Sequence, residues 1–242
     1  MRSTALGERG TSSLGPWRAA WTALPYQGQA PGGDRFLLAR SPTGDLCFVL
    51  ADAAGHGTLG NALWLRHEAT FLAAWRAFVA GCSLADFVDP LDASLCAGEA
   101  LDSVCLTVGR WQPSGALELS TCGYGTHALV RTAQGPWWAE PEALFGLKLG
   151  WFGPERRREL PRGLVQTRLS EVERIVLVSD GVLEDDHRNP EATLASLERA
   201  NHRCAPLPFA EVLETVLELA PAPAEDDLTV VALELEARSF RG

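Results

Sequence analysis

Two short glycine-containing segments, each carrying an aspartate, enclose a predicted β-hairpin and constrain the fold more than any other part of the chain. They are Gly32-Gly33-Asp34 and Ala51-Asp52-Ala53-Ala54-Gly55-His56-Gly57. Between them lie two apolar runs, 35–40 and 46–50, joined by a segment whose Pro and Gly favour a turn. Antiparallel pairing places the start of the first strand beside the end of the second. Asp34 and Asp52 are therefore expected to lie close together at one end of a sheet.

Two neighbouring carboxylates of this kind point to a cation, because they repel each other unless positive charge lies between them. Gly55 and Gly57 allow unusual backbone angles next to Asp52, so main-chain carbonyls can also turn toward an ion. Oxygen-only ligands suit Mg²⁺ or Mn²⁺ rather than zinc. From these two segments alone, a turn aspartate and a helix N-cap explain the pattern equally well.

Composition describes a folded globular chain. Its 242 residues are 46% hydrophobic and 21% charged, which suits a single domain with a sizeable core. Residues 1–20 are rich in Ser, Thr, Gly and Arg, so we expect a flexible N-terminal tail there and one domain over 21–242. The net charge of −10 argues against nucleic-acid partners and against attraction to an anionic membrane.

Cysteine usage and hydropathy point to the cytoplasm. The six cysteines have no C-x-x-C spacing and most lie in apolar runs, as expected for reduced thiols. No N-terminal stretch has the apolar core of a signal peptide, and no run approaches the ~20 apolar residues that a membrane helix needs.

The remaining pattern alternates strands and helices. A helix is predicted over 58–80, with a stripe of large aromatic residues on one face, and a variant capping box at Ser83 and Asp86 opens a second helix toward Cys96 that Pro90 breaks or kinks. A second hairpin is predicted over 103–111 and 116–122. Further predictions are strands at 128–132, 164–169, 174–179 and 229–235, helices at 190–201 and 208–219, and an irregular loop over 137–153.

The aspartates gather at the ends of these predicted strands. Asp180 follows the apolar run 175–178, and the pair Asp226-Asp227 precedes the last strand, so one rim can hold them together with Asp52. Two hard cations sharing Asp52 would stand about 3.5–4 Å apart, lower the pKa of a bridging water and neutralise phosphoryl oxygens during in-line attack. This chemistry is phosphoester hydrolysis without a protein nucleophile.

Four motifs now carry a family resemblance, which covers about residues 30–236. In order and spacing they resemble the motifs of SpoIIE-type, 2C-like metal-dependent serine/threonine phosphatases: Gly33-Asp34, Ala51-Asp52-x-x-Gly-His-Gly57, Ser179-Asp180-Gly181 and Asp226-Asp227-Leu-Thr229. The resemblance implies an α+β fold, a four-layer α-β-β-α sandwich with two mostly antiparallel sheets. It also implies a pair of Mn²⁺ or Mg²⁺ ions and a phosphoserine or phosphothreonine substrate.

The resemblance also implies residue roles. By matching positions, Asp52 bridges both metals, the Ala53 carbonyl binds one of them, Asp180 and Asp226 ligate the other, and Asp34 acts directly or through water. Around them stand Asp227, Gly55, Gly181 and His56, the last of which either orients a water or phosphate or is a structural turn residue.

One position departs from the pattern, because many relatives have Gly-Asp after the central hairpin where this chain has Gly123-Tyr124. The carboxylate of a third metal site is therefore missing or comes from elsewhere. Only about 30 residues precede the motifs. This minimal layout resembles that of RsbX-like stand-alone phosphatases, which implies a phosphorylated STAS-domain or anti-anti-sigma-like partner.

Rival functions fit the residues less well. The segment 179–183 is similar to the nucleophile loop of haloacid-dehalogenase phosphatases, but Val178 occupies the position of its nucleophilic aspartate. No cysteine is followed six residues later by Arg, so the cysteine-phosphatase loop is absent. The alternative from another class is a non-catalytic module that keeps the phosphatase fold to sequester a switch protein.

Overall fold

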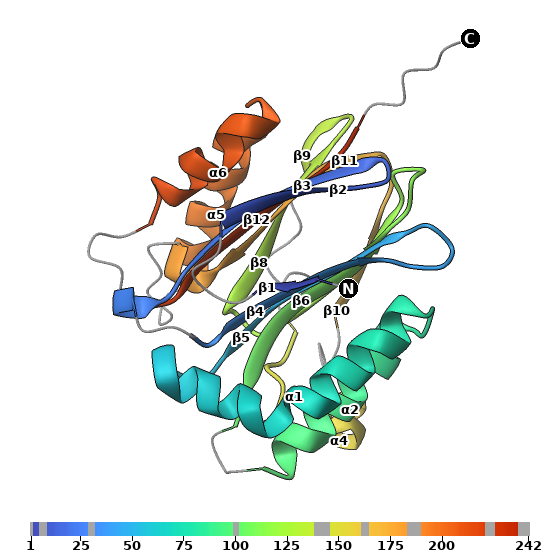
Figure 1. The fold of residues 1–242 in the computed structure, drawn as a ribbon, viewed down its shortest axis with the longest axis vertical. Coiled ribbons are helices and arrows are strands. Elements are labelled where there is room, and N and C mark those ends of the chain that lie inside the picture. Colours follow the sequence, from blue (N-terminus) through green and yellow to red (C-terminus); the bar gives the residue numbers. More distant parts are fainter. Residues whose placement is uncertain are drawn as a thin grey trace.

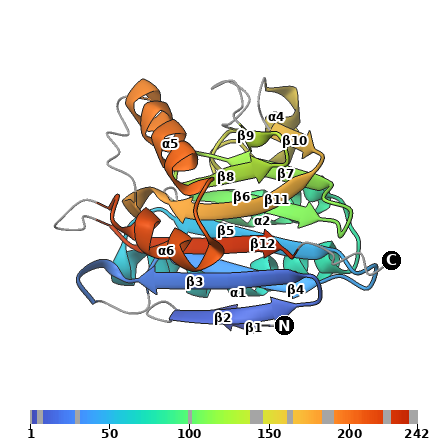
Figure 2. The same cartoon turned by 90° about the horizontal axis from the view of Figure 1, so that it is seen from above.

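Two stacked antiparallel sheets, each covered by a pair of helices, form the four layers that the sequence predicts (Figures 1 and 2). The computed structural model describes residues 2–4, 9–28, 32–98, 102–137, 146–160, 165–182, 190–220 and 226–236. The first sheet has the order β1 (Arg2–Thr4), β4 (Asp34–Arg40), β5 (Leu46–Ala53), β6 (Val104–Trp111), β7 (Leu117–Cys122) and β10 (Val165–Leu169). The second has the order β2 (Arg9–Leu14), β3 (Trp17–Leu24), β12 (Leu228–Leu235), β11 (Val172–Ser179), β8 (Thr126–Thr132) and β9 (Gly135–Trp137).

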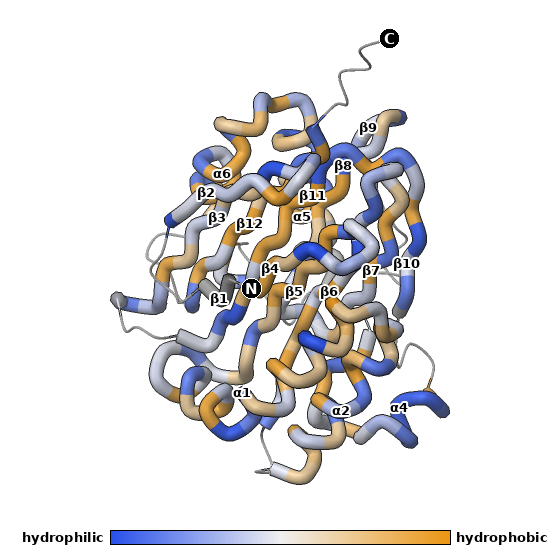
Figure 3. Tube along the Cα trace, turned by 45° about the vertical axis from the view of Figure 1, so that its right-hand side comes forward, coloured by the Kyte–Doolittle hydropathy of each residue, from blue (hydrophilic) through white to orange (hydrophobic). Residues whose placement is uncertain are grey.

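The central strands are buried on both faces, so their successive side chains alternate between two apolar clusters. In β4, Leu37 points toward the helices of the first sheet, whereas Phe36 and Leu38 point into the space between the sheets. β5 repeats this alternation with Val49 on the helix side and Phe48 on the inner side. Hydrophobic residues consequently run along the central strands of both sheets (Figure 3).

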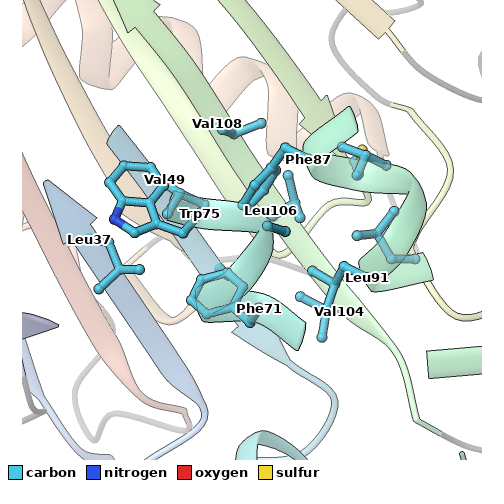
Figure 4. Packing of buried hydrophobic residues seen from close by; sticks show 14 of the residues in the cluster. Leu37, Val49, Phe71, Trp75, Phe87, Leu91, Val104, Leu106 and Val108 are labelled. Atoms are coloured by element: carbon cyan, nitrogen blue, oxygen red, sulfur yellow. The ribbon is translucent and has the colours of Figure 1, made fainter. Parts of the chain in front are cut away.

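Helices α1 (Gly57–Val79) and α2 (Leu84–Cys96) cover the outer face of the first sheet. Phe71 and Trp75 of α1 meet Phe87 of α2 above Leu37 and Val49, as Figure 4 shows. The buried aromatic stripe predicted for the first helix is therefore core. On the second sheet, α5 (Pro190–Cys204) and α6 (Phe209–Leu217) bury a third apolar cluster.

The predicted capping box at the start of α2 is confirmed. The Ser83 side chain accepts the Asp86 N–H, and the Asp86 carboxylate accepts the Ser83 N–H. Of the two effects predicted for Pro90, a break or a kink, the break is wrong, since α2 continues to Cys96. Buried Phe87 and Leu91 on either side of the proline anchor the helix to the sheet and offset its missing N–H.

The prediction of a flexible tail over residues 1–20 is wrong for residues 9–20. These residues form β2 and the first half of β3, and β3 pairs along its whole length with β12. Trp17 and Trp21 stand four residues apart on one face of β3 and are buried between the sheets. The polar residues of β2 occupy an outermost strand, so composition alone suggested a tail. A domain start at residue 21 is accordingly too late.

The predicted loop over 137–153 is only partly a loop. Trp137 ends β9, residues 138–145 lie outside the described part of the chain, and α4 (Pro154–Glu159) follows the loop. The segment in between is joined to the first sheet by single bridges at Gly146 and Leu149.

All six cysteines are free thiols. Within the described ranges, no helix is both long enough and apolar enough to cross a membrane.

Candidate metal centre and active site

The two aspartates of the first hairpin face each other directly. In the ladder between β4 and β5, Asp34 is the cross-strand partner of Asp52, as the alternation of the two strands predicts. The side chain of Asp34 is buried, with 3% of the residue exposed, whereas Asp52 is half-buried. Like charges opposite each other destabilise a sheet, so this pair needs a compensating partner.

The other predicted acids join Asp52 at a cavity of about 460 Å³. Asp180 follows β11 in a short 3-10 turn, where its N–H donates to the Gly125 carbonyl at 3.0 Å. Asp226 lies just before β12. The cavity is lined by Asp52, Ala53, Ala54, Gly55, Cys105, Gly123, Tyr124, Gly125, Gly146, Leu147, Lys148, Trp151, Asp180 and Asp226. Three of the predicted metal-binding carboxylates and the predicted carbonyl residue Ala53 therefore share one cavity.

Burial and mutual repulsion raise the pKa of both hairpin aspartates. For Asp34, burial is the largest cause; the nearby hydroxyl groups of Thr229 and Ser179 partly oppose it, while the charge of Asp180 adds to it. For Asp52, burial again comes first, followed by the charges of Asp180 and Asp34. Both pKa values lie well above the usual range of an aspartate.

The donor set fits a hard divalent cation. Oδ2 of Asp34 is buried and has no hydrogen-bond partner among the described residues, so it is an unused oxygen beside the cluster. Carboxylate and carbonyl oxygens are the ligands that Mg²⁺ and Mn²⁺ prefer. In the described part of the chain, no three His, Cys, Asp or Glu side chains are already arranged as a metal-binding group. The acids surround the cavity as separate donors, which agrees with their mutual repulsion.

Asp227 holds the cluster in place through the backbone. Its Oδ1 accepts the Tyr26 N–H at 2.7 Å, and its Oδ2 accepts the N–H groups of Gly33 and Gly57 at 2.6 and 3.2 Å. These bonds tie the residue before Asp34 to the first residue of α1. Gly181 packs against the Asp227 carbonyl so closely that a Cβ there would overlap it. The supporting role expected of Asp227 and Gly181 agrees with these contacts.

Glycines let the backbone approach the acids. Gly55 lies on the cavity with a φ of +88°, a conformation that favours glycine over other residues. A Cβ at Gly125 would overlap Oδ2 of Asp52, so this glycine, which sequence reasoning missed, shapes the cavity wall. Gly123 and Tyr124 line the same wall and bring no carboxylate there.

His56 lies at the start of α1 as its N-cap residue, with an extended backbone and no side-chain cap. Its ring is exposed and packs on Tyr26, with ring centroids 4.2 Å apart. Although Gly55 beside it lines the cavity, His56 does not. The geometry therefore favours the structural interpretation of this histidine.

Sequence reasoning also missed Cys105, Lys148 and Trp151 on the cavity wall. Cys105 is the cross-strand partner of Asp52 on β6, so strand register would have indicated it. Lys148 is the single lysine of the chain, a signal that the sequence already contains. Nothing in the residue pattern marks Trp151.

Comparisons with known proteins agree with this geometry. The family model of stage II sporulation protein E (SpoIIE) matches residues 42–236. The RsbU and RsbW domains of Rv1364c from Mycobacterium tuberculosis have a similar structure, with a TM-score of 0.70 at 22% identity over 96% of this chain and 63% of that chain. RsbX in complex with magnesium gives a TM-score of 0.66 at 12% identity over 95% of this chain and 100% of that chain.

A third similar structure contains the PP2C phosphatase domain and a fragment of the regulatory domain of SpoIIE from Bacillus subtilis. Its TM-score is 0.60 at 14% identity, over 91% of this chain and 64% of that chain. This chain thus spans less than two thirds of the Rv1364c and SpoIIE chains, and at such identities the likeness concerns the fold. No curated protein sequence matches this chain at a significant level.

The raised pKa values predict how the stability of the metal-free protein depends on pH. An aspartate in the unfolded chain has a pKa of about 3.9, so the folded state holds protons that the unfolded state has lost. The free energy of unfolding therefore falls as pH rises through the folded pKa. Replacing Asp52→Asn removes this effect, so the metal-free variant should have the higher thermal midpoint at about pH 8. The difference should vanish as pH falls toward about 4.

Asp227→Asn is the contrasting variant, because this carboxylate accepts three backbone N–H groups and its charge is only a minor cause of the raised pKa of Asp34. Placing an amide N–H₂ against the N–H groups of Gly33 and Gly57 should cost about 1–3 kcal/mol of unfolding free energy at every pH. Thermal and urea unfolding of both variants across pH measure these effects. An Asp52→Asn variant that is less stable than the parent at about pH 8 would show that the carboxylates do not repel one another.

Proposed function

Because the chain belongs to the SpoIIE family, we propose that it is a phosphoprotein phosphatase of the PP2C type, which hydrolyses phosphoserine and phosphothreonine esters with two Mn²⁺ or Mg²⁺ ions. The observation that carries this proposal is the presence of Asp52, Asp180 and Asp226 on one cavity, next to the buried Asp34.

The metal-holding residues are assigned from the family resemblance, and their shared place on the cavity supports the assignment. Asp52 would hold both ions, the Ala53 carbonyl would hold one of them, and Asp180 and Asp226 would hold the other. Asp34, the cross-strand partner of Asp52, would act on the ions directly or through a bound water. Bound divalent cations supply an acidified water and neutralise charge on the phosphoryl oxygens.

The described residues that line the cavity offer no activated side-chain nucleophile in place of water. The described lining residues include no serine or threonine, and their one thiol is that of Cys105. Burial raises the pKa of the Cys105 thiol, so this group stays protonated near neutral pH and is a poor nucleophile. Direct attack of water on the phosphoryl group is therefore the favoured route, without a covalent intermediate on the protein.

The first test is phosphate release from a phosphoserine peptide and a phosphothreonine peptide. We expect release when Mn²⁺ or Mg²⁺ is present, loss after exhaustive chelation, and recovery when the metal is restored. Activity that survives chelation would contradict the metal-dependent mechanism. A folded protein that binds Mn²⁺ and releases no phosphate from any phosphoprotein would favour the non-catalytic binding module.

A series of Asp→Asn variants tests the separate roles. Asp52→Asn should weaken the binding of both ions and reduce kcat most, because one carboxylate serves both. Asp180→Asn and Asp226→Asn should weaken one site, and Asp34→Asn should cost less, about 10–100-fold, if it acts through water. Asp45→Asn, at the turn end of the same hairpin, is the control that should change neither property. Near-normal turnover in Asp52→Asn with none in Asp34→Asn would overturn this assignment.

We infer that the substrate is a phosphorylated regulatory protein of the STAS-domain or anti-anti-sigma-like class. The support is the likeness to structures named for RsbX and for the RsbU and RsbW domains of Rv1364c. We expect kcat/KM for phosphorylated STAS-domain proteins to exceed that for phosphopeptides cut from the same proteins, because a folded partner adds contacts outside the cavity. Equal kcat/KM values for protein and peptide would contradict recognition of a folded partner.

A further inference from the structure

The single lysine of the chain lies at the carboxylate cavity. Of the 21 basic Lys and Arg residues, Lys148 is the one lysine, and it lines the cavity with Asp52, Asp180 and Asp226. Lysine and arginine differ physically: arginine presents a rigid planar fork, whereas lysine is a compact point charge on a flexible stem. A phosphate group entering between carboxylates needs positive charge, and Lys148 is the cationic side chain among the described lining residues.

Lys148 is close enough to Cys105, on the wall of the same cavity, for its charge to act on the thiol. Its positive charge lowers the pKa of the Cys105 thiol, partly opposing the effect of burial. Cys105 is the cross-strand partner of Asp52, so the lysine charge reaches the strand position next to the central carboxylate. No carboxylate of the described residues forms a salt bridge with Lys148, and its side chain is half-exposed. The charge is available to a ligand.

A buried ion pair fixes the backbone that carries this lysine. Arg157 of α4 and Asp92 of α2 are paired at 2.9 Å, and both side chains are almost fully buried. Arg157 also donates to the carbonyls of Leu147 and Lys148, at 2.5 and 2.6 Å. Asp92 accepts the Gly150 N–H at 2.7 Å. The pair thus binds backbone groups on both sides of Lys148 in addition to its own ionic contact.

The sheet holds the same segment from the other side. Leu149 exchanges two backbone hydrogen bonds with Val104 at the start of β6, at 3.0 and 3.2 Å.

Burying an ion pair such as Asp92–Arg157 is costly, and replacing one by apolar residues is often neutral or stabilising. A pair that sets the position of a functional backbone segment has a reason to be charged, because hydrogen bonds of charged groups to these carbonyls and this N–H are stronger than those of neutral groups.

We propose that Lys148 binds the phosphoryl group of the substrate, and that the Asp92–Arg157 pair is the positioning pair that holds it over the carboxylate cavity. The proposal rests on the proposed phosphatase function for the nature of the ligand. Lysine is a common phosphate ligand in proteins as a point charge. A cavity of about 460 Å³ is large enough for a phosphorylated side chain.

The first test measures binding of inorganic phosphate to the Mn²⁺-loaded protein by calorimetry. Lys148→Met keeps the length of the side chain and removes its charge, so affinity should fall about tenfold or more. Lys148→Arg should bind within a few-fold of the parent, and both variants should keep their Mn²⁺ affinity. Unchanged phosphate affinity in Lys148→Met overturns the proposal, as does an equal loss in both variants with Mn²⁺ affinity intact.

The single lysine also permits a chemical test that needs no turnover. Pyridoxal 5′-phosphate forms a Schiff base through its aldehyde with a primary amine, releasing water, and borohydride reduces the C=N bond to a stable amine. Mass spectrometry of peptides then distinguishes Lys148 from the N-terminal amine, the internal control. We expect excess inorganic phosphate to protect Lys148 and leave labelling of the terminus unchanged. Labelling of Lys148 that is insensitive to phosphate contradicts the proposal.

Arg157→Lys tests the positioning pair, since it keeps the charge and loses the fork that reaches both carbonyls. It should weaken phosphate binding in the parent and add nothing in the Lys148→Met background, a non-additivity that general destabilisation would not produce. Arg158→Lys, on the exposed side of the same helix, is the control and should have no effect. If Arg157→Lys does not fold, Asp92→Asn replaces it. Normal phosphate binding in the folded variant contradicts the positioning role.

The outcomes separate the two proposals. A protein that binds phosphate through Lys148 but dephosphorylates no phosphoprotein contradicts the proposed function alone. An active phosphatase whose Lys148→Met variant binds phosphate normally contradicts the role of Lys148 alone.

Discussion

Repulsion between Asp34 and Asp52 is the constraint on which the rest of the site depends. The ladder between β4 and β5 places these two carboxylates directly opposite each other, and burial removes the water that would screen them. Asp180 adds a further negative charge to both. Such a cluster persists because apolar packing on both faces of the hairpin fixes its register. A one-residue slip would move Phe36 and Phe48 out of the space between the sheets.

The neighbouring aspartates 226 and 227 show how environment separates two chemically identical groups. Asp226 lies on the cavity and adds charge to the cluster. Asp227 is not among the lining residues of the cavity, and its carboxylate accepts three backbone N–H groups. These bonds join the loop before β4, the start of α1 and the turn after β3. The repulsive acids are therefore held by an acid whose own hydrogen bonds are satisfied. Because of this division, we expect substitutions of the two adjacent carboxylates to have different consequences.

Local pattern was enough to predict the hairpin, the helix α1 and the strand-end aspartates, because each depends on period-two or helical spacing within a short window. The N-terminal strands were not predictable in this way, since β2 is polar and its pairing depends on Trp17 and Trp21 packing between sheets formed by later residues. The Lys148 segment was missed for a similar reason. Its position is set by Asp92, which is distant in sequence, and by Arg157, whose spacing from Lys148 follows no helical or strand period.

The central claim is that the cavity is a cluster of carboxylates completed by divalent cations. Calorimetric titration of the metal-free protein with Mn²⁺, in buffers of different ionisation enthalpy, tests it most directly. Because the pKa values of Asp34 and Asp52 are raised, binding should release protons, and the number released should fall as the pH rises above those values. The account would be contradicted if Mn²⁺ did not bind, or if it bound and released no protons throughout the range from about pH 5 to 8.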